Sequence, residues 1–477
     1  MKDYAVIGGG IGGCCAAALL NHRGYDVVLL EKEPTLGGCA STFKHNGYQY
    51  NAGATTVSGY NENGIVKKLF DTLHLTPNLI ATDPAIVIVQ EGKSVHRYRD
   101  VNAFVEDLQH LHPHPHPKHD EFWHLIHRIG ETFYTLNGHY YSNASLSKKI
   151  ISLLSLIPMA RKFLPYLWGD ASTFIEKFYG GISQEYRDFL DAQILIVAQA
   201  KSDKVNFFTA AISLGYTFNE THYAIGGMGK VCETLTTNIS DVRTSCEVLS
   251  IIKRNDHYLI KTRHGNIEAK NLIMGTSHYS SGRWFEDKEI KNYYQRYSKL
   301  DNHQSAFVLY LTLCTQKTFH HHYQLITKEM LPKTRSKALF VSFSDSSDTD
   351  IAPVGHFSVT ASIHTDSRFW LGLAPAQYKR EKKELHDLLQ AWICDTLAID
   401  SNEIVDSFAA TPKTFGRYLN RTQLGGNALS ISNFLPYLPS NDTPIKGFYH
   451  VGDTAYAAQG WPGVAMGAQN LMKLIHG

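Results

Sequence analysis

The chain opens with two short apolar runs that flank a stretch of small residues. Tyr4 to Ile7 and Asp26 to Leu30 read as continuous apolar segments, which are typical of strands buried on both faces of a parallel sheet. Cys14 to Leu20, between them, consists of small and apolar residues and predicts a helix. The chain is therefore expected to begin with a strand, a helix and a second strand.

The turn between the first strand and the helix carries the pattern G-x-G-x-x-G. Its first glycine allows a tight turn, the second lets backbone approach a pyrophosphate, and the third lets the helix pack closely on the strand. The phosphates would lie at the helix N-terminus, where free N–H groups and the dipole favour negative charge. Glu31 ends the second strand at about the distance expected for an acid that binds a ribose hydroxyl, and such an acid disfavours NADP. The residues of this predicted dinucleotide site are Gly8, Gly10, Ile11, Gly12, Gly13 and Glu31.

The middle of the chain predicts a second region of different character. Residues 60–220 are expected to form a largely helical insertion, with a hairpin formed by Ile86 to Gln90 and Ser94 to Tyr98. Phe307 to Leu313 and Phe357 to Ile363 predict strands of one antiparallel sheet. Later segments predict a return of the chain to the first sheet. Asp241 to Lys253 predicts one strand centred on Val248, and His257 to Thr262 with Asn266 to Ala269 predicts a hairpin. Asn271 to Met274 predicts a strand that ends at Gly275, and a buried strand from Gly447 is expected to end at Gly452-Asp453.

Residues 148–168 form an apolar segment with an unusual distribution of charge. The run is broken by Pro158, Arg161, Lys162 and Pro165, so it is too short and too interrupted to span a bilayer. Lysines before it, aromatic residues after it and the Arg-Lys pair within it suit a helix that lies in a membrane interface. An ordinary helix packed on the core fits the same composition, and both interpretations stay open.

Composition describes a globular protein with no sign of nucleic-acid binding. The chain has 477 residues, enough for two domains, and a net charge of +2 gives no reason to expect a polyanionic partner. The seven cysteines are scattered and lack the spacing of a zinc site, which suits a reducing compartment. The first strand is expected to begin at once, which leaves no room for a cleaved signal peptide. A cytoplasmic location is therefore expected. No metal site is predicted: the histidine-rich tract from Leu111 to His127 is interpreted as a solvated connector, and Ser342 to Asp350 as a polar loop that lacks the EF-hand spacing.

A second group of glycines strengthens the nucleotide hypothesis and points to a family. After Glu31-Lys32 come Gly37-Gly38-Cys39, then Gly47-Tyr48 and Gly53-Ala54-Thr55-Thr56. Together with the first turn, this pattern resembles the phytoene desaturase, carotenoid isomerase and retinol saturase branch of FAD-dependent oxidoreductases, which are relatives of the flavin amine oxidases. His222 to Lys230 resembles the P-x-G-G-M segment of that branch, with Ala224 in place of proline. The amine oxidases usually have arginine where this chain has Cys39, so the resemblance favours the desaturase branch.

The resemblance implies FAD as the cofactor and a set of residues around it. Beyond the first glycine turn and Glu31, the residues implied to bind FAD are Lys32, Gly38, Cys39, Ala54, Thr55, Val248, Gly275, Gly452, Asp453, Gly463 and Val464. Candidates for the neighbourhood of the reacting centre are Thr56, Tyr60, Arg417 and Trp461, and no catalytic acid or base is named. Arg417 and Arg421 lie in a stretch, Thr411 to Arg421, that resembles a segment of carotenoid isomerases and saturases, so they could meet an anionic or polar end of the substrate. They could instead be surface ion-pair residues.

The expected architecture is α/β: a Rossmann-like FAD-binding domain of the glutathione-reductase type and a second α+β substrate domain of antiparallel sheet and helices. The first domain is assigned to 1–80, 222–290 and 425–477, and the second to 81–221 and 291–424. By resemblance, the protein would desaturate, saturate or isomerise a lipophilic isoprenoid or polyene, with peripheral membrane contact through 148–168. A flavin amine oxidase acting on a small amine and a non-catalytic flavin-bound membrane scaffold are the alternatives.

Overall fold

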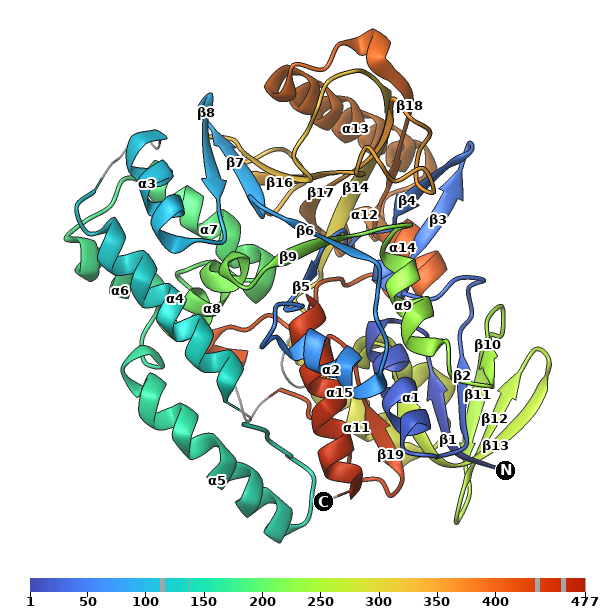
Figure 1. Cartoon of the computed structure of the whole chain (residues 1–477). Helices are drawn as coiled ribbons and strands as arrows, with labels where there is room; N and C mark the ends of the chain where they lie inside the picture. The colour runs from blue at the N-terminus through green and yellow to red at the C-terminus, as the bar shows by residue number, and fades with distance from the viewer. Residues whose placement is uncertain (112–115, 137, 434–437, 456–459, 477) are drawn as a thin grey trace.

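The computed structural model describes residues 1–111, 116–136, 138–433, 438–455 and 460–476. Two seven-stranded sheets organise the chain, and a layer of helices lies beside the second sheet (Figure 1). The first sheet lies in the lower right of the view and the second at the top, with α5 at the lower left margin.

The first sheet is the predicted nucleotide-binding sheet. Its strand order is β10-β2-β1-β13-β12-β11, and β19 pairs with β13. β10, β2, β1, β13 and β19 pair in parallel, whereas β11 and β12 form an antiparallel excursion. The bounds of these strands are β1 Lys2–Ile7, β2 Val27–Leu30, β10 Val242–Arg243, β11 Val248–Lys253, β12 Tyr258–Thr262, β13 Gly265–Met274 and β19 Phe448–His450.

Helices cover both faces of this sheet. One face packs on α1 Ile11–His22, α2 Ile65–Leu73, α9 Met228–Thr236 and α15 Gly460–His476. The other face packs on α11 Lys288–Tyr297, next to the short α10 His278–Ser281. Apolar burial on both faces explains why β1 and β2 are continuous apolar runs in the sequence.

Two details of this sheet differ from the sequence-based prediction. Asp241 to Lys253 is not one strand: the chain breaks after β10 because Ser245 adopts a left-handed conformation and its N–H donates to the Glu33 carbonyl at 3.0 Å. The strands predicted at 266–269 and 271–274 are one continuous strand, β13, which pairs antiparallel with β12 at its start and parallel with β1.

The second sheet has the order β18-β14-β17-β16-β15-β7-β8 and is antiparallel except between β15 and β7. It confirms the predicted hairpin, as β7 Ile86–Gln90 and β8 Lys93–Arg97. It also confirms the predicted antiparallel strands, as β14 Gln304–Cys314 and β17 His356–Asp366. The remaining strands are β15 His322–Ile326, β16 Ala338–Phe343 and β18 Ile404–Ala410.

One face of the second sheet packs on α12 Ser367–Gly372 and α13 Pro375–Leu397. Beside its other face lies the helical layer, whose members are α3 Val101–Leu111, α4 His119–Thr135, α6 Ala171–Tyr179, α7 Gln184–Ala198 and α8 Phe207–Gly215. Between the two large sheets run α14 Pro412–Leu419 and two small sheets, formed by β3 Thr42–His45 with β4 Tyr48–Asn51 and by β5 Val57–Ser58, β9 Thr221–Ala224 and β6 Leu79–Thr82.

The histidine-rich tract is not a solvated connector over its second half. Residues 112–115 lie outside the described part of the chain, but His119 begins α4. The side chains of His119, Phe122, Trp123 and Ile126 are buried in the helical layer. The spacing of these residues places them on one helix face, which the compositional interpretation overlooked.

α5 Leu146–Phe163 covers most of the segment predicted to contact a membrane. Only Ser152 and Phe163 of this helix are buried, whereas Leu146, Ile151, Leu153 and Leu154 are each more than half exposed. Among the described helices, none is by itself long and apolar enough to cross a bilayer, although Leu146–Tyr166 and Ala171–Tyr179, bent by 55° at their junction, satisfy length and composition as a pair.

Candidate active site

A cavity of about 1270 Å³ lies where the first sheet, the second sheet and the helical layer meet. Its wall includes the glycine turn after β1, the loops at 37–39 and 52–56, and the start of α15. It continues along the second sheet to apolar side chains that include Phe133, Met159 and Phe208. The volume exceeds the roughly 300–1,000 Å³ typical of single small-molecule sites, so two ligands could share it.

The first glycine turn has the geometry that its sequence predicts. Gly8 has φ of 99°, a conformation that favours glycine, and its N–H donates to the Leu30 carbonyl at 2.8 Å. A Cβ on Gly13 would lie 1.9 Å from the Gly8 carbonyl oxygen, so this glycine is required by close packing and does not line the cavity. Gly10, Ile11 and Gly12 do line it.

Glu31 lies at the end of β2 and forms part of the cavity wall. Its Oε2 accepts a hydrogen bond from the Gly9 N–H at 2.7 Å, and its Oε1 accepts one from the Glu33 N–H at 2.8 Å. Burial raises the pKa of Glu31, while these backbone donors oppose the rise. The carboxylate predicted to bind a ribose hydroxyl is therefore held beside the glycine turn by two backbone N–H groups.

Lys32 also lines the cavity, but its ammonium is engaged elsewhere. Its Nζ donates to the Arg417 carbonyl at 2.7 Å and lies 3.2 Å from a carboxylate oxygen of Glu33. Val248 at the start of β11 and Gly275 after β13 line the same end of the cavity.

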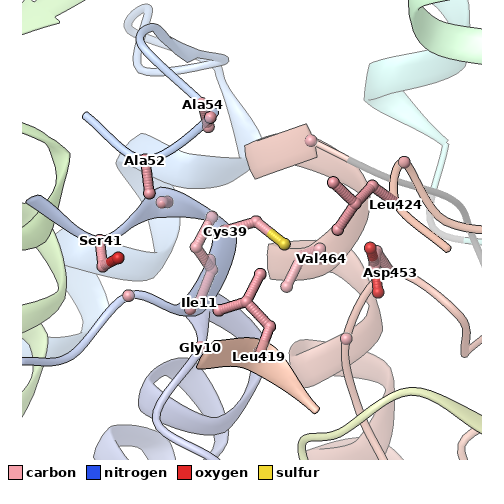
Figure 2. Close-up of a pocket in the computed structure, with 18 of the residues that line it drawn as sticks. Gly10, Ile11, Cys39, Ser41, Ala52, Ala54, Leu419, Leu424, Asp453 and Val464 are labelled. Carbon is pink, nitrogen blue, oxygen red and sulfur yellow. The ribbon is translucent and has the colours of Figure 1, made fainter. Parts of the chain in front are cut away.

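The second glycine loop lies against the first. The Gly37 N–H donates to the Gly9 carbonyl at 2.7 Å, and Gly38 and Cys39 follow in a short helical turn. Figure 2 shows the Cys39 side chain pointing toward Val464 on α15, with the Asp453 carboxylate facing the same space. Burial raises the pKa of the Cys39 thiol to about 11, so the group is a neutral thiol near pH 7.

An ion pair at the cavity wall joins the turn after β19 to a distant loop, whereas the ion pair that the sequence suggested for Arg421 lay at the surface. Arg421 Nη1 lies 2.9 Å from Asp453 Oδ1, and both residues line the cavity. Burial opposes the charge of Arg421, but the Asp453 carboxylate outweighs it and raises the pKa of Arg421. Arg421 is thus a buried partner of a predicted cofactor residue, whereas Arg417 is exposed and does not line the cavity.

The other predicted residues divide between the cavity and the core. Ala54, Thr55, Thr56, Trp461, Gly463, Val464 and Gly452 line the cavity. Tyr60 does not: its ring packs edge-on against Phe70 and His222.

A buried cluster of hydroxyl and imidazole groups supports the loop at 52–56. His322 Nε2 lies 2.9 Å from the Thr55 hydroxyl, and its Nδ1 lies 2.8 Å from the Thr56 hydroxyl. The Thr55 hydroxyl also contacts the Ser342 hydroxyl at 2.8 Å. Burial, with the neighbouring His321, lowers the pKa of His322 well below its usual value. In the sequence, the run His320-His321-His322 beside an apolar strand is the signal that could have indicated the histidine of this cluster.

The charges of the cavity wall are unevenly distributed. Among the described lining residues, the carboxylates are Glu31, Glu33, Glu247 and Asp453, all on loops and strands of the nucleotide-binding end. The end bounded by the second sheet and the helical layer therefore carries no acidic side chain within the described chain. The same described residues contain no group of three His, Cys, Asp or Glu side chains that could hold a metal ion.

Comparisons with known proteins agree with this arrangement. A family model described as an NAD(P)-binding Rossmann-like domain matches residues 6–73. Over 97% of its length the chain is 26% identical to the chloroplastic prolycopene isomerase of Daucus carota, of which the match covers 78%. It is 20% identical, again over 97% of its length, to the carotenoid 3,4-desaturase of Haloarcula japonica, of which 95% is covered.

This chain is similar along nearly its whole length to a carotenoid isomerase and a carotenoid desaturase. The resemblance drawn from the glycine motifs is therefore confirmed, and with it the predicted type of enzyme. Among solved structures, putrescine oxidase bound to putrescine matches with a TM-score of 0.65 and 15% identity, covering 100% of this chain and 99% of the other. At that identity the likeness establishes the fold: a Rossmann-like unit joined to a second α+β region, as predicted.

Proposed function

We propose that this protein is an FAD-dependent oxidoreductase that isomerises, desaturates or saturates a lipophilic polyene. The observation that carries the proposal is the single cavity that joins the glycine turn after β1 to an apolar chamber on the second sheet. The relatives named as prolycopene isomerase and carotenoid desaturase, which align along nearly the whole chain, support the same substrate class.

The residues present suit FAD. Glu31 would bind the adenosine ribose and the backbone of Val248 the adenine, while the N–H groups of Gly10 to Gly12 would receive the pyrophosphate. FAD supplies the hydride or electron transfer chemistry when bound. The start of α15 would favour negative charge on its ring because the first N–H groups of a helix lack intrahelical partners.

This chain's own residues would contribute position and exclusion of water. His322 fixes the hydroxyls of Thr55 and Thr56, which keeps the loop at 52–56 in place without introducing charge. The Arg421–Asp453 pair ties the loop after α14 to the C-terminal strand. We also propose that residues 1–80, 222–290 and 425–477 form an FAD-binding domain. Residues 81–221 and 291–424 then form the substrate domain.

An amine substrate is less well supported by the wall of the cavity. A protonated amine placed in an apolar chamber needs a buried counter-charge. The carboxylates among the described lining residues lie at the nucleotide end, and Asp453 is already paired. A neutral hydrocarbon chain needs no such partner.

The test is an absorbance spectrum of the purified, FAD-reconstituted protein, followed by anaerobic addition of a lipid extract or of small amines. We expect a flavin spectrum, conversion of a polyene detected by mass spectrometry, and no bleaching by amines. Bleaching by amines with no polyene conversion would favour an amine oxidase. A bound flavin that no donor reduces, with no polyene converted, would favour a non-catalytic scaffold, and failure to bind FAD at all would overturn the proposal.

We further propose that α5 contacts a lipid surface through which the substrate enters. Its exposed leucines and isoleucines are flanked by exposed Arg161, Lys162 and Trp168, and Met159 of the same helix lines the cavity. In Figure 1 the helix lies at the margin of the molecule, away from both sheets. An apolar helix with basic residues near its ends is suited to the boundary between headgroups and acyl chains.

A matched pair of variants tests this contact. Leu153 on α5 and Leu249 on β11 are both 53% exposed, so Leu153→Glu and Leu249→Glu change the surface equally. We expect flotation with anionic vesicles to fall for Leu153→Glu and to remain unchanged for Leu249→Glu. Equal flotation of both variants and of the unmodified protein would contradict the assignment to α5.

A further inference from the structure

The wall that the second sheet presents to the cavity is more polar than a pure hydrocarbon ligand requires. Four of its polar side chains have partners. His322 binds the hydroxyls of Thr55 and Thr56, and Ser342 binds that of Thr55. The Tyr310 hydroxyl donates to the Ala52 carbonyl at 2.6 Å, and the Thr360 hydroxyl donates to the Asn51 carbonyl at 3.2 Å. Two others, Ser362 and His364, line the cavity as well. In the described part of the chain, neither the Ser362 hydroxyl nor the His364 ring has a hydrogen-bond partner.

Both residues are placed on the cavity face by the register of the sheet. They lie two positions apart on β17, so their side chains share one face. Ser362 is opposite Val308 and His364 is opposite Ala306 on β14, and both of these apolar neighbours line the cavity too. The two unpaired polar groups therefore lie side by side on an otherwise apolar strip.

The chemistry of His364 restricts what it can bind. Burial, and to a smaller extent the nearby Arg335, lowers the pKa of His364 to about 4, so the ring is neutral at pH 7. The charge of Arg335 is taken up by Asp366, to which its guanidinium is hydrogen-bonded. A neutral imidazole offers one donor and one acceptor, which suits a hydroxyl or carbonyl group and not a charged one.

The length of β17 separates His364 from the part of the sheet that contacts β4. Thr360 contacts Asn51, the last residue of β4 before the loop at 52–56, and His364 lies four residues further along β17. At a rise of roughly 3.3 Å per residue, His364 is about 13 Å from Thr360 along the strand. An oxygen bound at His364 would thus lie well away from that contact.

We propose that the natural substrate is an oxygenated polyene whose hydroxyl or carbonyl group hydrogen-bonds to His364 and Ser362 on the cavity wall formed by the second sheet. The inference rests on the proposed function and specifies its substrate. A ligand that covers this polar pair without hydrogen-bonding to it leaves both groups desolvated and unpaired, so the pair selects for a ligand that satisfies it.

The experiment compares two acyclic C40 polyenes, lycopene and its 1-hydroxy derivative rhodopin, by equilibrium titration of the FAD-loaded protein. We expect rhodopin to bind about 10-fold more tightly, the effect of one net hydrogen bond. His364→Leu should remove this preference while binding of lycopene is retained or improved. His364→Gln keeps a hydrogen-bonding side chain and should retain part of the preference for rhodopin. It provides a second test in case His364→Leu does not fold.

His356→Leu is the control, because His356 lies on the same strand outside the cavity lining and should leave the preference unchanged. Equal binding of the two polyenes by the unmodified protein, or a preference that survives in His364→Leu, would overturn this inference alone. Binding of neither polyene by the FAD-loaded protein would overturn the proposed function and this inference together.

Discussion

The folded chain has room for a side chain at Gly10, whereas a cofactor bound at the glycine turn would leave none. The backbone of Gly10 has φ of −69° and ψ of 174°, an ordinary extended conformation. A Cβ built there would have only the Gly37 carbonyl oxygen nearby, at 4.0 Å. Gly10→Ala is therefore expected to leave the unfolding free energy of the apoprotein unchanged within about 0.5 kcal/mol.

The same methyl group would occupy space at the helix N-terminus, where the pyrophosphate is proposed to lie. Holding the phosphates away from the free N–H groups of the turn would remove at least one hydrogen bond to a charged group, each contributing about 1.5–3 kcal/mol. One such bond corresponds to a rise in the FAD dissociation constant of about 10- to 150-fold. The magnitude depends on the phosphate approaching this backbone and on no other contact of Gly10.

The assay is a fluorescence titration of deflavinated protein with FAD, accompanied by denaturant unfolding of the same preparation. Gly130→Ala is the control: Gly130 lies within α4 with open space around its Cβ, so alanine should raise stability by about 1 kcal/mol through helix propensity and leave FAD binding unchanged. A folded Gly10→Ala protein that binds FAD as tightly as the unmodified chain would refute the placement of the pyrophosphate on this turn.

Three further predictions concern stability. Gly13→Ala should lower the unfolding free energy of the apoprotein by at least about 1–3 kcal/mol in denaturant unfolding, because its Cβ would collide with the Gly8 carbonyl oxygen; unchanged stability would contradict the packing role. A double-mutant cycle of Asp453→Asn and Arg421→Gln should give a coupling energy of about 1–3 kcal/mol, and zero coupling would mean that the 2.9 Å contact contributes nothing. Burial lowers the pKa of His278 to about 3, below its value of about 6.5 in the unfolded chain, so its contribution to stability is complete above about pH 6.5 and is lost as the pH falls toward 3. His278→Asn should therefore reduce the loss of unfolding free energy between pH 7 and pH 5. An unaltered pH dependence of stability would contradict this prediction.

The nucleotide end of the cavity was predictable because its constraints are local. A tight turn, a close helix and an anchored acid each need a particular residue at a particular spacing, and Gly8, Gly13 and Glu31 meet these needs within thirty residues. Sequence spacing does not fix the direction of a side chain outside such a motif. Tyr60 and Arg417 were predicted to lie near the reacting centre, but the Tyr60 ring packs against Phe70 and His222, and Arg417 is exposed to solvent.

The substrate end was not predictable because its residues are brought together only by the folded sheet. Thr55 and His322 are 267 positions apart and meet because β15 passes behind the loop at 52–56. Thr55 belongs to a motif that the sequence did reveal, but His322, taken alone, is an unremarkable polar residue at a strand end. Similarity to known sequences indicates a class of relatives. It does not show which side chains meet at this end of the cavity, because that depends on the register of the second sheet.

The distribution of polar groups links these two ends into one functional argument. At the nucleotide end, charge is present and paired, as in Arg421 and Asp453, which suits a ligand that carries phosphates. Along the second sheet the polar groups are neutral, and His322, Ser342 and Thr360 among them bind other parts of the described chain. A wall of this kind suits a long apolar ligand better than a second charged one. In the proposal made above, Ser362 and His364 then distinguish one polyene from another.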